Sequence, residues 1–542
     1  MEEVKRMPER TECVLPVMLD ARAEQQPDKV FALFENGRQW TYQDAQEVSQ
    51  GTAEALSNLG VSYGDNVLVW LPSNDDIVRV HFGLSYLGAV FVPVNLSLRG
   101  SLLGHVINLT GANLLICHTE LADRLEHVDL CNISKIVFVG GEPTQKFEGV
   151  EVLSESSLDG DASKFVPSTN SIEPWTVQAM YFTSGTTGPS KAVPHTHLQS
   201  AVYGAVHLKL CNQDDRWLVN TPYFHLAATL VPFGVLIMGM SFAMLENYRT
   251  STYWDFVRKT GSTCCMMFGS IPAFLMKEPE RPDDADTPMR LVNLSPVIQD
   301  YKEFKRRFGV EVITSWDSTE APTALISDVI SEVPGPGFCG QIQPNMANIE
   351  LRLLDENDCE VELGEAGECA IRSDLPWVVA PEYYKNPEAT AKAWRNGWFH
   401  TGDMMRKDAQ GNFFFVDRTK DMIRRRGENI SSLEVEQEIL SHPSVGDAAV
   451  LSVTDDEKLD EEVLAVVVPI SGKAIDEAEL FAFLRERMAH FALPRYIRVL
   501  DQLPYTETKK IQKPLLRSEG VTPETWDRVA EGIIVKGTKL GT

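Results

Sequence analysis

The stretch YFTSGTTGPSKAVPHTH, residues 181–197, gathers hydroxyl groups, glycines and a cation within a few positions. Between Thr183 and Lys191 it contains five hydroxyl residues and two glycines, and an apolar run precedes it. Backbone N–H groups and hydroxyls can surround phosphate oxygens, and a lysine ammonium can neutralise their charge. The stretch is therefore predicted to bind a polyphosphate. A flexible turn is the alternative interpretation, because glycine and short hydroxyl residues are also typical of loops.

Four further motifs follow this stretch along the chain: STEAP (318–322), WFHTGDM (398–404), VDRTKDMIRRRGENIS (416–431) and TETKKIQK (506–513). Each of them is a weak signal when taken alone. In this order the five motifs resemble the adenylate-forming superfamily, which contains acyl- and aryl-CoA synthetases, adenylation domains of peptide synthetases and firefly luciferase. Within that superfamily, the sequence pattern of the chain is most similar to that of crotonobetaine/carnitine-CoA ligases and their acyl-CoA synthetase relatives.

The resemblance implies a two-step reaction that uses ATP, Mg²⁺ and CoA. A carboxylate attacks the α-phosphate of ATP to give acyl-AMP and pyrophosphate, and a thiol then displaces AMP. The physical difficulty is to bring two anions together, so the site must supply positive charge and hydrogen-bond donors. The resemblance implies that residues 181–197 hold the β- and γ-phosphates until pyrophosphate leaves. Its phosphate-binding residues are Thr183, Ser184, Gly185, Thr186, Thr187, Gly188 and Lys191.

The other motifs take their expected roles from the same resemblance. Thr319 contacts phosphate and Glu320 holds Mg²⁺, an ion that prefers oxygen ligands and keeps several waters. Trp316 stacks on adenine. Asp403 accepts hydrogen bonds from both ribose hydroxyls, and Arg418 reaches the ribose and phosphate as a bidentate donor. By residue type alone, these would be a surface glutamate, a turn aspartate and an arginine in a surface ion pair.

Lys510 matches the catalytic lysine of the superfamily, which bridges the attacking carboxylate and the α-phosphate in the transition state. Lys420 falls at the hinge about which the C-terminal domain rotates between the two half-reactions. Gly427, in the charged segment that follows, is counted among the cofactor-binding residues. His225, in PYFHLAA, stands where family members place an aromatic residue or a histidine along the acyl site; a structural histidine is the alternative.

Several positions depart from the family pattern. Asp317, also counted among the cofactor-binding residues, replaces a glycine that flanks the acyl pocket, where a carboxylate would narrow the pocket or accept from a polar substrate group. The segment 293–298 replaces a Gly-Gly-Ala-Pro stretch near the adenine, as in carnitine-type ligases. Arg426 and Lys509 each stand in place of a glycine, in regions that bear on thioester formation. Together they leave open a protein that forms acyl-AMP well and thioester poorly.

The bulk composition excludes some partners. Acidic residues outnumber basic ones 77 to 50, which gives a formal net charge of −27 over 542 residues. Such a chain repels nucleic acid and anionic lipid. The nine cysteines form no framework, which indicates a reducing cytoplasm and no structural zinc. Residues 226–245 are apolar and long enough to span a membrane, but a buried helix that runs into a core strand is the preferred interpretation.

The elements that must position these residues follow an α/β pattern. Apolar runs alternate with amphipathic stretches, which predicts largely parallel strands with intervening helices. A second series of this kind covers about 181–329, and hairpins with polar turns follow after Gly335. The expected strands of the first series are 66–71, 89–93, 114–118 and 135–140, and its expected helices are 42–59 and 76–87.

The C-terminal part is predicted to be a compact α/β unit, with helices at 432–441 and 476–489 and strands at 447–454 and 462–469. We therefore expect an α/β fold with a large N-terminal adenylating domain, residues 1–416. This domain has several subdomains, mostly parallel sheets with helices and a small β-barrel-like part. A hinge at 417–420 joins it to a small mobile α/β domain, 421–542, that carries the catalytic lysine.

The function predicted from the sequence is ATP-dependent activation of a small or medium carboxylic acid, followed by transfer to CoA. One alternative is a stand-alone adenylating enzyme that hands the acyl-AMP of a bulky acid, such as a terpenoid of secondary metabolism, to a partner thiolating enzyme. The other is a non-catalytic nucleotide-binding protein, although a sensor has no use for Lys510. No nucleic acid and no membrane span are expected, self-association is left open, and the acid itself is not predicted.

Overall fold

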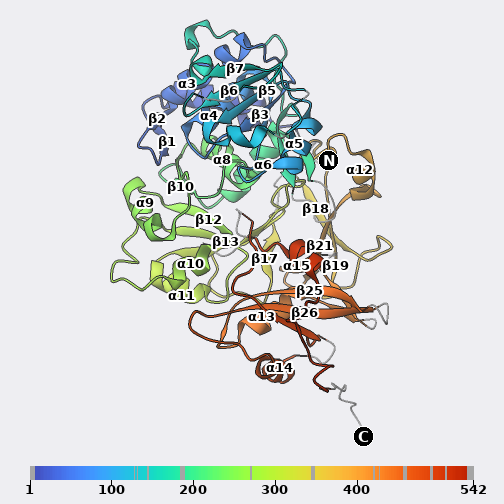
Figure 1. Cartoon of the computed structure of the whole chain (residues 1–542). Helices are drawn as coiled ribbons and strands as arrows, with labels where there is room; N and C mark the ends of the chain where they lie inside the picture. Colours follow the sequence, from blue (N-terminus) through green and yellow to red (C-terminus); the bar gives the residue numbers. More distant parts are fainter. Residues whose placement is uncertain are drawn as a thin grey trace. The chain divides into compact units, whose positions relative to one another are not determined.

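The computed structural model describes most of the chain (Figure 1). The described residues are 6–126, 128–130, 132–142, 146–183, 190–268, 271–343, 348–418, 421–425, 428–455, 460–488, 492–506 and 510–533. They form two compact units. Unit 1 consists of Met1–Val333, Cys339–Leu351 and Ile371–Phe399, and unit 2 of Pro334–Phe338, Arg352–Ala370 and His400–Thr542. Thr419 and Lys420 lie outside the described residues, and the hinge at 417–420 stays a prediction.

Unit 1 contains two seven-stranded sheets, and the first carries the ends of the predicted phosphate-binding stretch. Its strand order is β7-β6-β5-β3-β4-β8-β9, and all neighbouring strands are parallel except β8 and β9. Its central strands are continuous apolar runs, as expected for parallel strands buried on both faces. The strands predicted between residues 66 and 140 are thereby confirmed. The bounds are β3 Asn66–Trp70, β4 Val90–Pro93, β5 Leu114–His118, β6 Lys135–Val139, β7 Glu151–Ser154, β8 Val177–Thr183 and β9 Lys191–Thr196.

The second sheet of unit 1 has the order β14-β13-β12-β10-β11-β1-β2, with every pair parallel except β1 and β2. Two mostly parallel sheets in one unit confirm the α/β fold class that the alternation of apolar runs predicted. The bounds are β1 Val30–Phe34, β2 Gln39–Thr41, β10 Arg216–Val219, β11 Ser241–Met244, β12 Cys264–Phe268, β13 Leu291–Ser295 and β14 Glu311–Ile313.

Local signals in the sequence determine where the helices of unit 1 begin and end. Helix α3 begins after Thr41, whose hydroxyl accepts from the Asp44 N–H while the Asp44 carboxylate accepts from the Thr41 N–H. Helix α4 begins after the cap Asn74 and ends at Gly88, which has a φ of 69°. The bounds are α1 Arg10–Cys13, α2 Leu15–Gln25, α3 Tyr42–Asn58, α4 Asp75–Leu87, α5 Gly100–Thr110, α6 His197–His207, α7 Leu226–Thr229, α8 Val231–Met238, α9 Tyr253–Thr260, α10 Ile271–Lys277, α11 Tyr301–Phe308 and α12 Pro387–Ala393.

Helix α6 is placed by a contact between two glycines. Gly204 of α6 faces Gly234 of α8, and a Cβ atom added at Gly204 would lie 2.5 Å from the backbone nitrogen of Gly234. A side chain at either position would push the two helices apart, so the close approach of their backbones depends on glycine.

The apolar segment 226–245 folds as helices α7 and α8 followed by strand β11, which confirms the interpretation of a buried helix that runs into a core strand. Pro232 lies in the first turn of α8, where a missing N–H costs nothing, and Gly239 ends that helix with a φ of 66°. Among the helices of the described residues, none has the length and apolar character that a membrane crossing requires.

Unit 2 is built around a four-stranded sheet with the order β25-β26-β27-β28. The helices and strands predicted between residues 432 and 489 are confirmed here, and the second helix is shorter at both ends than predicted. Ser431 caps α13 and Asp476 caps α14. The bounds are β22 Phe413–Arg418, β23 Ile423–Arg425, β24 Glu428–Ile430, α13 Ser432–Leu440, β25 Val445–Asp455, β26 Asp460–Pro469, α14 Glu477–Arg485, β27 Tyr496–Val499, α15 Lys513–Glu519 and β28 Trp526–Asp527.

The strand-and-turn region after Gly335 runs through both units. Within unit 1, β15 pairs antiparallel with β16, and β16 with β17; within unit 2, β21 pairs antiparallel with β22. Four strands, β17, β18, β19 and β21, contain residues of both units. The strands here are confirmed, but the β-barrel-like part is not. The bounds are β15 Ser315–Trp316, β16 Leu325–Ile326, β17 Phe338–Ile342, β18 Ile349–Leu354, β19 Gly367–Ser373, β20 Trp394–Arg395 and β21 Trp398–Lys407.

Three histidines are completely buried inside unit 1. His81 contacts the Tyr223 hydroxyl and the Gln178 side chain at 3.1 and 2.9 Å, and its ring stacks on Phe91. Burial lowers the pKa of His81 and of His195 to about 4, and that of His197 to about 3. Since a protonated imidazole is poorly solvated there, all three rings stay neutral at physiological pH.

These histidines make the stability of unit 1 sensitive to acid. Each folded-state pKa lies below the unfolded value of about 6.5, so only the unfolded chain takes up the proton as the pH falls. Stability is therefore fully present above about pH 6.5 and lost as the pH falls toward 4. From pH 7 to pH 5, His81 alone should cost about 2 kcal/mol of the free energy of unfolding. Urea denaturation of wild type and His81→Gln at both pH values measures this loss.

The variant His105→Gln serves as the control, because His105 is half-buried on α5. The expected result is a pH-dependent loss of stability that shrinks in His81→Gln and persists in His105→Gln. An equal pH dependence in wild type and His81→Gln would show that His81 does not contribute to the acid sensitivity.

Candidate active site

The two ends of the predicted phosphate-binding stretch are paired across the β8–β9 hairpin. Thr183 lies opposite Lys191 in the antiparallel register, and the Thr183 hydroxyl donates to the Lys191 carbonyl at 3.5 Å. Both side chains are half-buried. Ser184, Gly185, Thr186, Thr187 and Gly188 lie outside the described residues, so their roles stay predictions.

The segment 317–321, which contains the predicted Thr-Glu pair, is held by side chains of β9 and α6. His195 Nε2 donates to the Thr319 carbonyl at 2.5 Å, and Gln199 Nε2 donates to the Glu320 carbonyl at 3.1 Å. Tyr203 donates through its hydroxyl to the Ala321 carbonyl at 2.5 Å and contacts the Ser318 carbonyl as well. Because Gln199, Tyr203 and His207 are four residues apart, they lie on one face of α6. That face fixes the backbone of the segment.

Asp317 is bound by the last of these α6 residues. The Nε2 atom of the buried His207 lies 3.1 Å from Asp317 Oδ2 and 2.8 Å from the Thr323 hydroxyl. The Asn293 amide donates to Nδ1 of the same ring at 3.5 Å, which leaves the proton on Nε2 facing Asp317. The Asp317 side chain keeps 26% of its surface exposed. The carboxylate that replaces the family's glycine is thus oriented by α6 while remaining accessible.

Tyr383 connects two predicted site residues that come from distant parts of the sequence. Its hydroxyl donates to Glu320 Oε1 at 2.8 Å, and the Lys191 ammonium lies 4.3 Å from the centre of its ring. The structure therefore brings Lys191, Thr319 and Glu320 together within unit 1. Nothing in the sequence pattern marked Tyr383, because a buried tyrosine is an ordinary core residue whose partner cannot be identified locally.

Two further residues of unit 1, predicted to contact the adenine and the acyl group, have surroundings typical of structural residues. Trp316 is buried on β15. His225 caps the N-terminus of α7, where Nδ1 accepts from the Ala227 N–H at 3.2 Å, and its ring centre is 6.1 Å from that of Phe268. A capping histidine agrees with the structural alternative for His225, while its contact with an acyl group stays a prediction.

In unit 2, Asp403 and Arg418 are paired with each other. They face across the β21–β22 hairpin, and Arg418 Nε lies 2.8 Å from Asp403 Oδ1. The Asp403 side chain is buried and the Arg418 side chain is about half exposed. A buried carboxylate held by a charged donor is well suited to accept further hydrogen bonds from hydroxyl groups.

Lys510 and Lys513 have contrasting environments in unit 2. Lys510 is exposed; its carbonyl accepts from the Thr506 N–H at 2.8 Å, and its N–H donates to the Thr506 hydroxyl at 3.0 Å. The Lys513 side chain is only 14% exposed, and its Nζ lies 2.7 Å from both Glu436 Oε1 and the Ser432 hydroxyl of α13. The Asp417 carboxylate accepts from the Ser432 N–H at 2.6 Å. Lys513 therefore anchors the base of the segment that presents Lys510, a role the sequence did not reveal.

Burial raises the pKa of both carboxyl groups beside Lys513. Desolvation is the main cause for Glu436 and for Asp417, and the Lys513 ammonium opposes it in each case. The charged forms of these acids therefore depend on the lysine, because an unpaired carboxylate is costly away from water.

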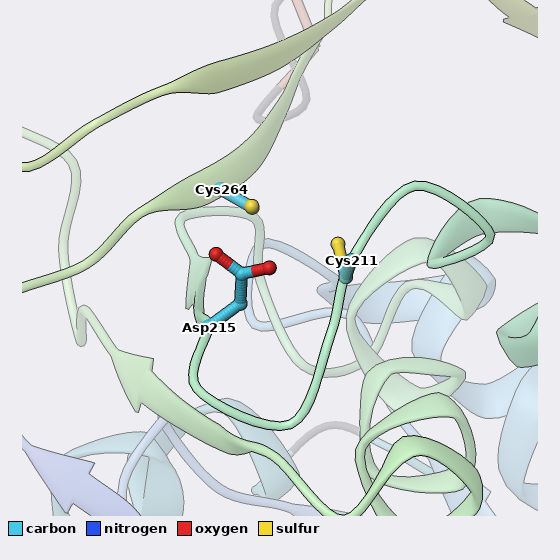
Figure 2. A group of neighbouring side chains, drawn as sticks. All are labelled: Cys211, Asp215 and Cys264. Atoms are coloured by element: carbon cyan, nitrogen blue, oxygen red, sulfur yellow. The ribbon is translucent and has the colours of Figure 1, made fainter.

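A separate cluster of Cys211, Asp215 and Cys264 has the composition of a metal site. Figure 2 shows the two thiols and the carboxylate turned toward one another, and their ligand atoms lie within 4.8 Å. However, each Asp215 oxygen already accepts two hydrogen bonds, of 2.5–2.8 Å, from Arg290, the Thr263 hydroxyl and the Asn212 N–H. These bonds fill the four acceptor positions of a carboxylate. The cluster is therefore a structural ion pair, and Glu320 stays the metal ligand predicted here.

Comparison with known proteins extends over nearly the whole chain. The family model described as AMP-binding enzyme matches residues 19–384, and the model of the AMP-binding enzyme C-terminal domain matches residues 434–510. Crotonobetaine/carnitine–CoA ligases of Salmonella paratyphi A and Citrobacter koseri are each 31% identical to this chain. The matches cover 92% of this chain and 98% of each ligase.

Solved structures share the fold. The anthranilate CoA ligase AuaEII, in complex with anthranoyl-AMP, has a TM-score of 0.81 at 23% identity and covers 96% of this chain and 98% of its own. The o-succinylbenzoate CoA synthetase of Bacillus subtilis, in complex with OSB-AMP, has a TM-score of 0.78 at 24% identity. It covers 92% of this chain and 97% of its own.

The two neighbouring lysines should differ in their effect on stability. Replacing Lys513 with Met leaves Glu436 and Asp417 buried beside no cation and should cost about 3–5 kcal/mol of the free energy of unfolding. Lys510→Met removes an exposed ammonium and should change it by less than about 0.5 kcal/mol. Urea denaturation measures both values, and hydrogen exchange in α13 assigns the loss to unit 2. Equal, small effects of the two substitutions would contradict the anchoring role of Lys513.

Proposed function

Because the chain belongs to the family of AMP-binding enzymes, we propose that it activates a carboxylic acid as acyl-AMP with ATP, releases pyrophosphate and transfers the acyl group to CoA. The enzyme is thus an AMP-forming acid–thiol ligase. In this protein, the proposal is supported by one observation: Tyr383 contacts both Lys191 and Glu320. It gathers a cation and a carboxylate beside the strand ends of the predicted phosphate-binding stretch.

In this proposal, the residues of unit 1 bind the polyphosphate. Lys191 neutralises the phosphates, and the Thr319 hydroxyl contacts them. Glu320 fits Mg²⁺, since it offers a half-buried carboxylate whose backbone and side chain are both held by hydrogen bonds. Magnesium takes one or two protein carboxylates together with phosphate oxygens, and when bound it neutralises the charge of the departing pyrophosphate. Trp316 stacks on the adenine.

The residues of unit 2 complete the site in the same proposal. Asp403 accepts from the ribose hydroxyls and Arg418 donates to the ribose and phosphate. The domain 421–542 moves about the hinge 417–420, so that Lys510 is delivered to the α-phosphate for adenylation and withdrawn for the thioester step. An exposed lysine suits this task, and its ammonium stabilises the charge of the transition state. Gly427, which lies outside the described residues, is counted among the cofactor-binding residues. The proposed location of both steps is the cytoplasm.

The acid that we propose carries a polar or cationic group close to its carboxylate. The accessible carboxylate of Asp317, oriented by His207, supports a substrate that donates to it or bears positive charge. The relatives named crotonobetaine/carnitine–CoA ligases support the same class of small acids. Pyrophosphate exchange over a panel of acids, repeated with CoA, tests both half-reactions. Exchange without thioester formation would favour the transfer of acyl-AMP to a partner thiolating enzyme.

Lys510→Ala should lose acyl-AMP formation by about 10²–10³-fold, because one donor to the charge of the transition state is removed. ATP binding should change little, since the side chain is exposed and enters the site only for the reaction. Pyrophosphate exchange measures the loss, and calorimetry measures ATP binding. Lys473→Ala, at another exposed lysine of unit 2, is the matched control. Exchange at the wild-type rate in Lys510→Ala would show that another residue supplies the catalytic cation.

Asp317→Gly should shift the preference of the enzyme toward longer or more apolar acids. The change removes both the bulk and the charge of the side chain, and pocket changes of this kind alter discrimination by about 1–3 kcal/mol, roughly 10–200-fold. The measurement is kcat/KM for pairs of acids that differ in one polar or cationic group. Asp328→Gly removes an exposed acid and should leave the ranking as it is. The same ranking in Asp317→Gly as in wild type would place the carboxylate outside the acyl pocket.

A further inference from the structure

Tyr383 is the residue through which the predicted metal ligand and the predicted phosphate-binding lysine meet. Its hydroxyl donates a hydrogen bond to Glu320 Oε1, with 2.8 Å between the two oxygens. The Lys191 ammonium lies 4.3 Å from the centre of the tyrosine ring. The residue is only 6% exposed. A single buried side chain therefore contacts a carboxylate with its polar end and a cation with its aromatic face.

The position of Tyr383 is fixed by packing and by the backbone around it. Its ring is 5.2 Å from that of Trp394 in an edge-to-face arrangement, and its N–H donates to the Thr390 hydroxyl at 3.0 Å. Backbone hydrogen bonds also join the segment around Tyr383 to Glu320 and to the residue that follows Lys191. The Ala380 N–H donates to the Glu320 carbonyl at 2.7 Å, and the Tyr384 N–H donates to the Ala192 carbonyl at 2.8 Å.

The hydroxyl and the ring have different chemical effects. A hydrogen bond to one oxygen of a carboxylate fixes its orientation, and partners of this kind tune the affinity of metal-binding carboxylates. The aromatic face attracts the ammonium electrostatically but donates no proton to it. Lys191 is thereby held over the ring of the tyrosine that binds Glu320, and the ring takes up none of its N–H donors.

We propose that Tyr383 is a positioning residue for the magnesium complex of ATP. Its hydroxyl orients the Glu320 carboxylate for the metal ion, and its ring holds the Lys191 ammonium where the polyphosphate binds. This inference rests on the proposed roles of Lys191 and Glu320 and adds to them a residue that touches neither ATP nor the acid. Tyr383 therefore acts through two other side chains rather than on the reacting atoms.

Two substitutions separate these effects. Tyr383→Phe removes the hydroxyl and keeps the ring, whereas Tyr383→Leu removes both and keeps an apolar side chain. The chain offers a matched control in Tyr384→Phe: this neighbouring tyrosine also has a lysine over its ring, Lys385 at 5.1 Å, and its hydroxyl accepts from Asn66 at 3.4 Å. Tyr384 contacts neither Lys191 nor Glu320 in any bond described above.

The measurement is ATP binding by calorimetry in the full-length protein at a series of Mg²⁺ concentrations, which requires no acid substrate. In Tyr383→Phe, the Mg²⁺ concentration for half-maximal binding should rise about tenfold, while the affinity for ATP at saturating Mg²⁺ stays close to wild type. Tyr383→Leu should show the same rise and also a loss of about threefold or more in ATP affinity at saturating Mg²⁺. Tyr384→Phe should match wild type.

The variant Glu320→Gln distinguishes the failure of this inference from that of the proposed function. If Glu320→Gln shifts the Mg²⁺ dependence and Tyr383→Phe does not, the role of Tyr383 is overturned and that of Glu320 stands. If neither variant shifts it, the assignment of Glu320 to the metal is wrong, and the inference falls with it. Equal shifts in Tyr383→Phe and Tyr384→Phe would reveal a general structural effect and would also overturn the proposal. Tyr383→Phe decides the matter even if Tyr383→Leu does not fold.

Discussion

The hydrogen bonds that β9 and α6 direct at the carbonyl groups of residues 318–321 are the interaction on which the site in unit 1 depends. These residues belong to no regular strand or helix, so their carbonyls take donors from elsewhere. His195, Gln199 and Tyr203 supply the donors. The Ala380 N–H also donates to the Glu320 carbonyl, so hydrogen bonds to the backbone hold this segment and the Glu320 carboxylate can bind Tyr383. The segment is held by neighbouring elements rather than by its own secondary structure.

The fold could be predicted further than the site. Strands such as Leu114–His118 were identified to the residue, because a parallel strand buried on both faces is a continuous apolar run bounded by polar residues. The helix that begins at Tyr42 was located by the pattern and is fixed by the capping box at Thr41. The β-barrel-like part rested on the resemblance alone, and strand pairing among the described residues does not confirm it.

The site residues divide in a similar way. Motifs predicted Lys191, Glu320 and Asp403 as site residues, but not the side chains that contact them. Tyr383 is 63 residues from Glu320, and His207 is 110 residues from Asp317. Contacts between residues so far apart in the sequence cannot be predicted from local residue spacing, because the residues between the partners belong to other elements. The two lysines of unit 2 illustrate the same limit: their residue type is identical, and only the tertiary structure makes Lys510 exposed and pairs Lys513 with a buried glutamate.

The contact between Gly204 and Gly234 connects this site to a helix that supplies none of its residues. The donors at Gln199, Tyr203 and His207 all stand on α6, and α6 can approach α8 only while both glycines lack a side chain. A single added methyl group on α8 would displace the donors together, as one rigid body, and would loosen their hold on the Thr-Glu segment. The mutational target for loss of activity is therefore larger than the set of residues that touch the nucleotide. Inherited variants at Gly234 would behave as active-site mutations although they lie in the hydrophobic interior.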